Sequence, residues 1–280
     1  MGAKPGRQCK GDADDVRAAL PEHAAEAGEP LLRVPAGAGA VIFGDSWAED
    51  NTNSSSGPLA GVQGWPGHLV QYLGLQLVGN FAKGQSESPS LLAQLQAAKA
   101  SFDPSEPPWS RVLVILHSGG NDFIGAEKGY NPFAQDNFWL QHCLWGFRRK
   151  AEEVIANLRD FLEKLHALGC RRFLISDLPF TSAVPALKVA RVAKVDKRGR
   201  WLNERLGEML RDFRGSCGPG SVDIGHVREV HTLNGIIASC DSRSKVRKLF
   251  LSDRFHPTDE THRLLAKAVA ARVPVAAGAS

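Results

Sequence analysis

The sequence predicts an α/β fold in which a parallel sheet is covered by helices on both faces. Short apolar segments alternate along the chain with segments long enough to form helices. The apolar segments are rich in Val, Ile, Leu and Phe and are mostly apolar throughout, as strands buried on both faces should be. Helix-length connections favour right-handed crossovers, each of which covers one side of a parallel sheet.

Five strands are expected, at residues 40–43, 75–81, 111–118 and 171–179, with a weaker candidate at 221–227. The clearest helix is expected at 149–169, between the third and fourth strands. Its apolar residues recur at three- and four-residue steps from Ala151 to Leu168, and Gly169 supplies the stop. A second, less regular helical pattern covers 258–273.

The length and composition favour one large domain. With 280 residues, of which 43% are hydrophobic, the chain can bury a sizeable core. We expect a flexible Ala/Gly/Pro-rich leader at 1–39 and a single domain at 40–280. The formal charge is +4, and the basic residues are scattered except for the run Lys194 to Arg200. We interpret this run as a solvated loop or helix end, so no nucleic-acid partner is expected.

The sequence also bears on the compartment. No apolar run approaches the roughly 20 residues that a membrane span needs, and the first residues lack the apolar region of a secretory signal. We therefore expect an intracellular, cytoplasmic protein without stable membrane insertion. The five cysteines are widely spaced and form no zinc pattern, which predicts reduced thiols. A Cys217–Cys240 disulfide in an exported form stays open.

The first candidate for chemistry is Ser46, in the stretch "FGDS" that ends the first expected strand. A serine hydroxyl is a weak nucleophile unless a base removes its proton, and that base must be oriented by a third group. The same triplet of Gly, Asp and Ser is also ordinary turn chemistry. Ser46 alone therefore does not decide between the two interpretations.

A base and an orienting acid occur near the C-terminus, in "DRFHP". Asp253 lies three residues before His256, a spacing that places both side chains on one side of a turn. Asp253 could then fix the tautomer of His256 and leave its other ring nitrogen free to take the serine proton. Because this spacing is common, the pair alone favours a structural role.

Two further segments could stabilise an oxyanion. In "GGND", which follows the third expected strand, the side-chain amide of Asn121 can donate a hydrogen bond. In "NFAKG", which follows the second, Gly84 could present a backbone N–H. Each segment could equally be a simple turn. Together the four segments favour catalysis, because a parallel sheet brings them to one edge and their residue types complete one mechanism.

These four blocks, "FGDS", "NFAKG", "GGND" and "DRFHP", resemble the SGNH/GDSL hydrolase superfamily of esterases and lipases. The resemblance implies a three-layer, flavodoxin-like α/β/α sandwich and a triad of Ser46, His256 and Asp253. It also implies an oxyanion hole built from the Ser46 N–H, the Gly84 N–H and the Asn121 side chain, with no metal and no cofactor. In lipase-like members the glycine of the second block usually lies one residue further from its Asn, where this chain has Gln85.

The expected activity is hydrolysis of a small-molecule, lipid or carbohydrate ester through an acyl-enzyme. An acyltransferase that uses the same triad is one alternative, and a non-catalytic binding module is another. The sequence has no G-x-S-x-G elbow, no H-E-x-x-H motif and no Gly-rich phosphate loop, which excludes three other classes of enzyme. Five aromatic residues could wall a substrate pocket or belong to the core: Phe133, Phe138, Trp139, Trp145 and Phe147.

Overall fold

The computed structural model describes residues 30–102, 109–123, 144–187 and 192–276, without the side chains of 144–146 and 192–194. Its described strands form one five-stranded parallel sheet in the order β2-β1-β3-β4-β5. The strands are β1 (Gly39–Gly44), β2 (Gln76–Asn80), β3 (Val112–His117), β4 (Arg172–Ser176) and β5 (Asp223–Val227). All five strands predicted from the sequence are confirmed.

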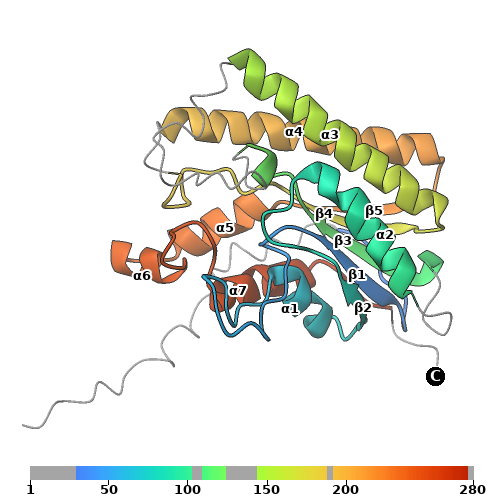
Figure 1. Ribbon diagram of the computed structural model, residues 1–280, viewed down its shortest axis with the longest axis horizontal. Helices are drawn as coiled ribbons and strands as arrows, with labels where there is room; N and C mark the ends of the chain where they lie inside the picture. Colours follow the sequence, from blue (N-terminus) through green and yellow to red (C-terminus); the bar gives the residue numbers. More distant parts are fainter. Residues whose placement is uncertain (1–29, 103–108, 124–143, 188–191, 277–280) are drawn as a thin grey trace, which may run out of the picture.

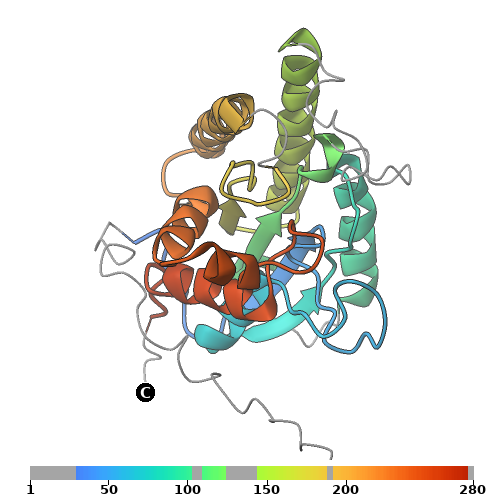
Figure 2. The ribbon, with the colours of Figure 1, turned by 90° about the vertical axis from the view of Figure 1, so that its left-hand side faces the viewer.

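Helices cover both faces of the sheet (Figure 1). They are α1 (Trp65–Tyr72), α2 (Leu91–Ser101), α3 (Leu144–Ala167), α4 (Val192–Cys217), α5 (Glu229–Ala238), α6 (Arg243–Lys248) and α7 (Asp259–Ala270). Short 3-10 helices occur at Ser88–Ser90, Trp109–Arg111 and Asn121–Phe123. Figures 1 and 2 place α2, α3 and α4 on one side of the sheet and α1 and α7 on the other. The predicted three-layer α/β/α sandwich is confirmed.

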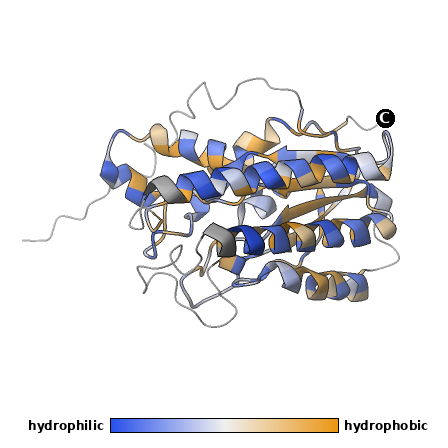
Figure 3. Cartoon of the chain, turned by 90° about the horizontal axis from the view of Figure 1, so that it is seen from above, coloured by the Kyte–Doolittle hydropathy of each residue, from blue (hydrophilic) through white to orange (hydrophobic). Residues whose placement is uncertain are grey.

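The core lies between these layers. Every residue is buried in β1 and β3, which are adjacent inner strands of the sheet. The residues of β2, at the edge, are half-buried or exposed. Figure 3 shows the same division, with hydrophobic strands between helices that also carry hydrophilic residues. These strands are packed on both faces by apolar side chains, apart from His117 at the end of β3, so the loops at the carboxyl edge have a fixed base.

The basic run at 194–200 is a helix end, one of its two expected forms, because it lies in the first turns of α4. It is not fully solvated, since Arg198 is buried, with its guanidinium 5.3 Å from the centre of the Phe147 ring. The last part of the expected leader packs against the domain. Leu32 and Val34 are buried there, and the Val34 N–H donates to Pro274 O at 3.0 Å. Residues 32–34 of the expected leader therefore contact the domain, and residues 1–29 lie outside the described part.

Two further sequence expectations concern thiols and membranes. Cys217 and Cys240 are both free thiols, so they form no disulfide here. Within the described ranges, no helix combines the length and the apolar character that crossing a bilayer requires.

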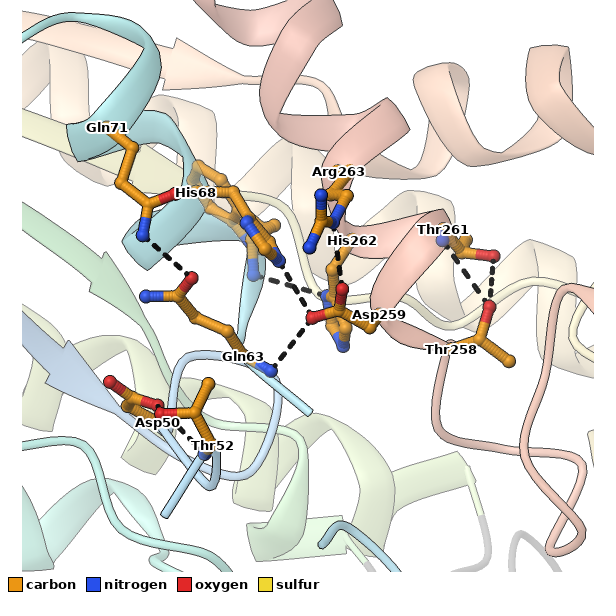
Figure 4. Close-up of polar contacts among 11 residues, drawn as sticks. Asp50, Thr52, Gln63, His68, Gln71, Thr258, Asp259, Thr261, His262 and Arg263 are labelled. Carbon is orange, nitrogen blue, oxygen red and sulfur yellow. Dashed lines mark hydrogen bonds and ion pairs between the residues drawn. The ribbon is translucent and has the colours of Figure 1, made fainter. Parts of the chain in front are cut away.

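Polar contacts join α1 to α7 on one face of the sheet (Figure 4). His68 Nε2 lies 2.9 Å from Asp259 Oδ1, which also accepts a hydrogen bond from the Gln63 N–H at 3.1 Å. The Trp65 N–H donates to Nδ1 of the buried His262 at 3.2 Å, which requires that nitrogen to be unprotonated. A second histidine–aspartate pair therefore exists in the protein, but it fastens two helices together.

Low pH should weaken the contact between α1 and α7. Burial, together with the neighbouring histidines, lowers the pKa of His262 to about 3, against 6.5 in the unfolded chain. Because the unfolded state binds the extra proton, stability should be lost as the pH falls from about 6.5 towards 3, by up to about 1.4 kcal/mol per pH unit. Chemical unfolding measured across this range checks the slope.

The variant His262→Gln should flatten that slope, because it removes the titrating ring and keeps an acceptor for the Trp65 N–H. His231→Gln is the matched control, since the His231 side chain is exposed. An unchanged slope in His262→Gln would contradict the assignment.

Candidate active site

Ser46 follows β1 on a sharp turn whose shape depends on Gly44. The φ of Gly44 is +146°, and a Cβ on this residue would lie 2.0 Å from the carbonyl oxygen of His117. Only glycine can therefore end β1 so close to β3. The next N–H, that of Asp45, donates to the same carbonyl oxygen at 3.1 Å. The chain thus leaves the sheet abruptly and carries the half-buried Ser46 at the carboxyl edge.

A buried glutamine of α2 holds this turn in place. The Gly44 N–H donates to Gln94 Oε1 at 2.9 Å, and Gln94 Nε2 donates to the Gly44 carbonyl at 2.8 Å. Two hydrogen bonds in a buried setting satisfy the backbone that leaves the strand. Gln94 was not identified from the sequence, because a single glutamine in a helix carries no periodic signal.

Asp253 and His256 lie in the loop between α6 and α7. The Leu251 N–H donates to His256 O at 2.8 Å, so the loop closes on itself just before α7. Asp253 Oδ1 accepts the backbone N–H groups of Phe255, at 2.9 Å, and of His256, at 3.0 Å. The carboxylate therefore shapes the loop that carries the histidine.

The structure brings the three expected residues into one hydrogen-bonded row. Ser46 Oγ lies 2.8 Å from His256 Nε2, and His256 Nδ1 lies 2.5 Å from Asp253 Oδ2. The side chains of His256 and Asp253 are 17% and 20% exposed, so the row is shielded yet open to a small molecule. An imidazole between a hydroxyl and a carboxylate can take the hydroxyl proton while the carboxylate stabilises the resulting charge.

The charge state of Asp253 suits this arrangement. Burial raises the pKa of Asp253, but the hydrogen bonds from the His256 ring and from two backbone N–H groups outweigh it, and the pKa lies below its ordinary value. An ionised Asp253 accepts the Nδ1–H of His256, which leaves Nε2 without a proton and facing Ser46.

Asn121 and the loop after β2 lie together, as expected. Asn121 is buried in the short 3-10 helix after β3, and its Nδ2 donates to Ser86 O at 3.0 Å. The adjacent Asp122 accepts from the N–H and the hydroxyl of Ser88, both at 2.7 Å. Burial raises the pKa of Asp122 to about 6 despite these bonds. The two loops are therefore fastened to one another.

The loop that carries Gly84 is also tied to the Ser46 turn. Asn80 Nδ2 donates to Ala48 O at 2.9 Å. Gln85 has a φ of +66°, a left-handed conformation that glycine adopts most easily. Among the described residues, no acceptor bonds the backbone N–H of Ser46, Gly84 or Gln85. The described residues thus leave these three N–H groups without a hydrogen-bond acceptor.

The five aromatic residues that could wall a substrate pocket fall into two groups. Phe133, Phe138 and Trp139 and the side chain of Trp145 lie outside the described residues. Phe147 is buried, and its ring centre lies 5.3 Å from that of Phe123 and 5.9 Å from that of Trp201. Phe147 therefore belongs to the core.

Comparison with solved structures gives the same fold at low sequence identity. A lipase from a goat rumen metagenome is 14% identical, with a TM-score of 0.51, over 85% of this chain and 97% of that one. A mutant of an acetyl-xylooligosaccharide esterase from Geobacillus is 15% identical, with a TM-score of 0.54, over 84% of this chain and 93% of that one. A search of curated proteins finds no match.

The family is identified by a sequence model rather than by these structures. The model of the GDSL-like lipase/acylhydrolase family matches residues 41–269, which include every expected site residue. The chain therefore belongs to the GDSL-like lipase/acylhydrolase family and is a carboxylic ester hydrolase.

Proposed function

We propose that this chain hydrolyses carboxylic esters through a covalent acyl-enzyme on Ser46. The observation that carries the proposal is the hydrogen-bonded row from Ser46 Oγ through the His256 ring to Asp253, with distances of 2.8 and 2.5 Å. In this row His256 is the base and Asp253 orients it. The three groups come from two loops at the same edge of the sheet, where ligands of open parallel sheets bind.

The reaction then has two halves. In the first, His256 Nε2 takes the Ser46 proton as Oγ bonds to the ester carbonyl carbon, and the tetrahedral intermediate collapses as the leaving alkoxide receives that proton. In the second, His256 takes a proton from water, the hydroxide oxygen bonds to the acyl carbon, and Ser46 regains its proton as the acid departs. Asp253 stays ionised and stabilises the imidazolium in both halves.

The negative oxygen of each intermediate needs donors. We assign the Ser46 N–H, an N–H of the loop after β2 and Asn121 Nδ2 to this role. Asn121 Nδ2 carries two hydrogens, and only one of them is used by Ser86 O. For the second donor, Gly84 is the residue expected from the sequence. The left-handed φ of Gln85 supports the Gln85 N–H instead, since Gln85 stands where related chains place a glycine.

Asn121→Ala should lower kcat by about a hundred- to a thousandfold, or about 3–4 kcal/mol of transition-state stabilisation, with a smaller change in KM. The loss follows because the amide stabilises charge that exists only in the transition state. Steady-state kinetics with p-nitrophenyl acetate measures it. Asn234→Ala, at an exposed asparagine of α5, is the control, and a loss of less than about tenfold in Asn121→Ala would contradict the assignment.

A panel of esters tests the activity and the substrate class together. It contains p-nitrophenyl esters from acetyl to long chains and acetylated xylo-oligosaccharides, since one of the similar structures is that of an acetyl-xylooligosaccharide esterase. We expect hydrolysis of at least one class that depends on Ser46. Adding a sugar or a short alcohol as acceptor gives the ratio of acyl transfer to hydrolysis. A ratio above one would favour an acyltransferase over a hydrolase as the main activity. Rates equal to buffer for every ester would contradict the proposal.

A further inference from the structure

His117, the last residue of β3, lies between two carboxylates that come from other parts of the chain. Its Nδ1 is 2.9 Å from Glu229 Oε2, at the start of α5, and its Nε2 is 3.6 Å from Asp45 Oδ1. The three side chains are 1%, 1% and 4% exposed, respectively. Neither Glu229 nor His117 has a role in the chemistry proposed above, so this buried array needs an explanation.

The geometry favours a charged ring. Nδ1 of the ring faces Glu229 Oε2 at 2.9 Å and the Ser176 hydroxyl at 2.7 Å, and Nε2 faces Asp45 Oδ1 at 3.6 Å, an ion-pair distance that is too long for a hydrogen bond. Two nearby carboxylates favour the charged form of an imidazole. Burial lowers the pKa of His117, but Glu229 and Asp45 outweigh it and raise the pKa to about 9. Burial also raises the pKa of the Glu229 and Asp45 carboxyls, and the charge on His117 opposes that rise in both. The indole of Trp47 lies parallel to the ring, with centres 5.6 Å apart and planes 1° apart, as a cation over an aromatic face would.

The array reaches the Ser46 turn through Asp45. The Asp45 N–H donates to His117 O at 3.1 Å, and Asp45 Oδ1 accepts the Trp47 N–H at 3.1 Å. The Asp45 carbonyl accepts the N–H groups of Ala48 and Glu49, both at 3.0 Å. Asp45 is thus bonded to the end of β3 and to the three residues that follow Ser46, so its position sets the backbone that presents the hydroxyl and the Ser46 N–H.

The Trp47 ring also contacts the loop between α6 and α7, which carries His256 and is called the histidine loop below. Its ring centre lies 5.8 Å from that of Phe255, the residue before His256. The other ionisable groups that act on the array are Glu49 and His256 near Asp45, and Asp177 near Glu229. The charge on His117 also acts on His262 of α7, whose pKa it lowers. Through Asp45 and Trp47, the Ser46 turn and the loop that carries His256 therefore both connect to the buried His117.

We propose that Asp45, His117 and Glu229 form a positioning array, in which a His117 imidazolium anchored by Glu229 holds the Asp45 carboxylate and thereby the turn that presents Ser46. This inference rests on the proposed function, since it describes how the nucleophile is held. None of the three residues touches the reacting atoms, so each is a positioning residue.

The charge on His117 is measured first, in the unaltered protein. NMR of the histidine ring nitrogens, with His117 assigned from the spectrum of His117→Gln, should find the ring protonated on both nitrogens at pH 7.5. A neutral His117 ring at this pH would overturn the inference without any need for a functional variant.

The link to Ser46 is measured by the labelling rate with a fluorophosphonate and by kinetics with p-nitrophenyl acetate. Glu229→Gln keeps the shape and removes the charge, and it should lower both the labelling rate and kcat about tenfold or more while KM stays within about threefold. Glu229→Asp, which keeps the charge, should recover part of the loss. Asp259→Asn, in the pair that fastens α1 to α7, is the control, and thermal unfolding confirms that each variant is folded.

The outcomes separate this inference from the proposed function. An unaltered protein that does not react with the fluorophosphonate at Ser46 removes the proposed function, whatever the state of His117. A protein that reacts, but whose Glu229→Gln variant is folded and reacts at the same rate, overturns the positioning array alone.

Discussion

Replacing Ser46 with Ala should lower kcat for p-nitrophenyl acetate by roughly ten-thousandfold or more, because no acyl-enzyme can form without the hydroxyl. The remaining rate would come from the donors that still hold the carbonyl oxygen. The Ser46 side chain has His256 as its hydrogen-bond partner, and alanine leaves this partner in place. Steady-state kinetics and single-turnover measurements check the loss.

The matched control is Ser252→Ala. Ser252 is exposed and lies next to Asp253 in the histidine loop, so this variant removes a nearby hydroxyl without touching the hydrogen-bonded row. Its kcat should stay within about twofold of the unaltered protein. A Ser46→Ala protein that keeps more than a tenth of its turnover would contradict the assignment of the nucleophile.

Asp253→Asn should lower kcat by roughly ten-thousandfold at neutral pH while KM changes little. An asparagine can donate as well as accept, so it no longer selects the Nδ1–H tautomer and no longer balances the imidazolium. The short contact of 2.5 Å between Asp253 Oδ2 and His256 Nδ1 makes this group the sole carboxylate in direct contact with the ring, among the described residues. Kinetics from pH 6 to 9 measures the loss.

The protein supplies its own control for this variant. Asp259 contacts His68 at 2.9 Å, a second aspartate–histidine pair that joins α1 to α7. Asp259→Asn should lower the thermal midpoint but leave kcat within about threefold. Equal losses of kcat in the two variants would mean that Asp253 acts through the stability of the fold instead of through His256.

The strands and the central residues of the site could be predicted because their signals are local. Each strand is a short apolar run, and Ser46, Asn121 and the residues around Gly84 follow the ends of β1, β3 and β2 directly. The pairing of Ser46 with His256, 210 positions apart, was expected from the resemblance to the hydrolase family and from the rule that the functional loops of a parallel sheet share one edge. That rule brings segments together but does not give the distances.

Helix α4 was missed because its first turns are rich in Lys and Arg and contain Gly199, which lowers helix propensity. Tertiary contacts offset this. The buried apolar residues along α4 include Leu202, Leu206 and Phe213, and the missing Cβ of Gly199 leaves room for the carbonyl oxygen of Phe180, 2.1 Å from where that atom would be.

The supports of the site could not be predicted for a different reason. Gln94 bonds to Gly44 across 50 positions, and Glu229 reaches His117 across 112. Single polar residues of this kind have no spacing pattern, and their partners are chosen by packing. Their burial becomes visible only when the sheet and the helices are in place.

Reaction with a fluorophosphonate, followed by digestion and mass spectrometry of the modified peptide, tests the central claim most directly. The hydrogen-bonded row of Ser46, His256 and Asp253 predicts one adduct on Ser46, lost in Ser46→Ala and greatly slowed in Asp253→Asn. An adduct on another residue, or equal labelling of the unaltered protein and Ser46→Ala, would contradict nucleophilic catalysis by Ser46.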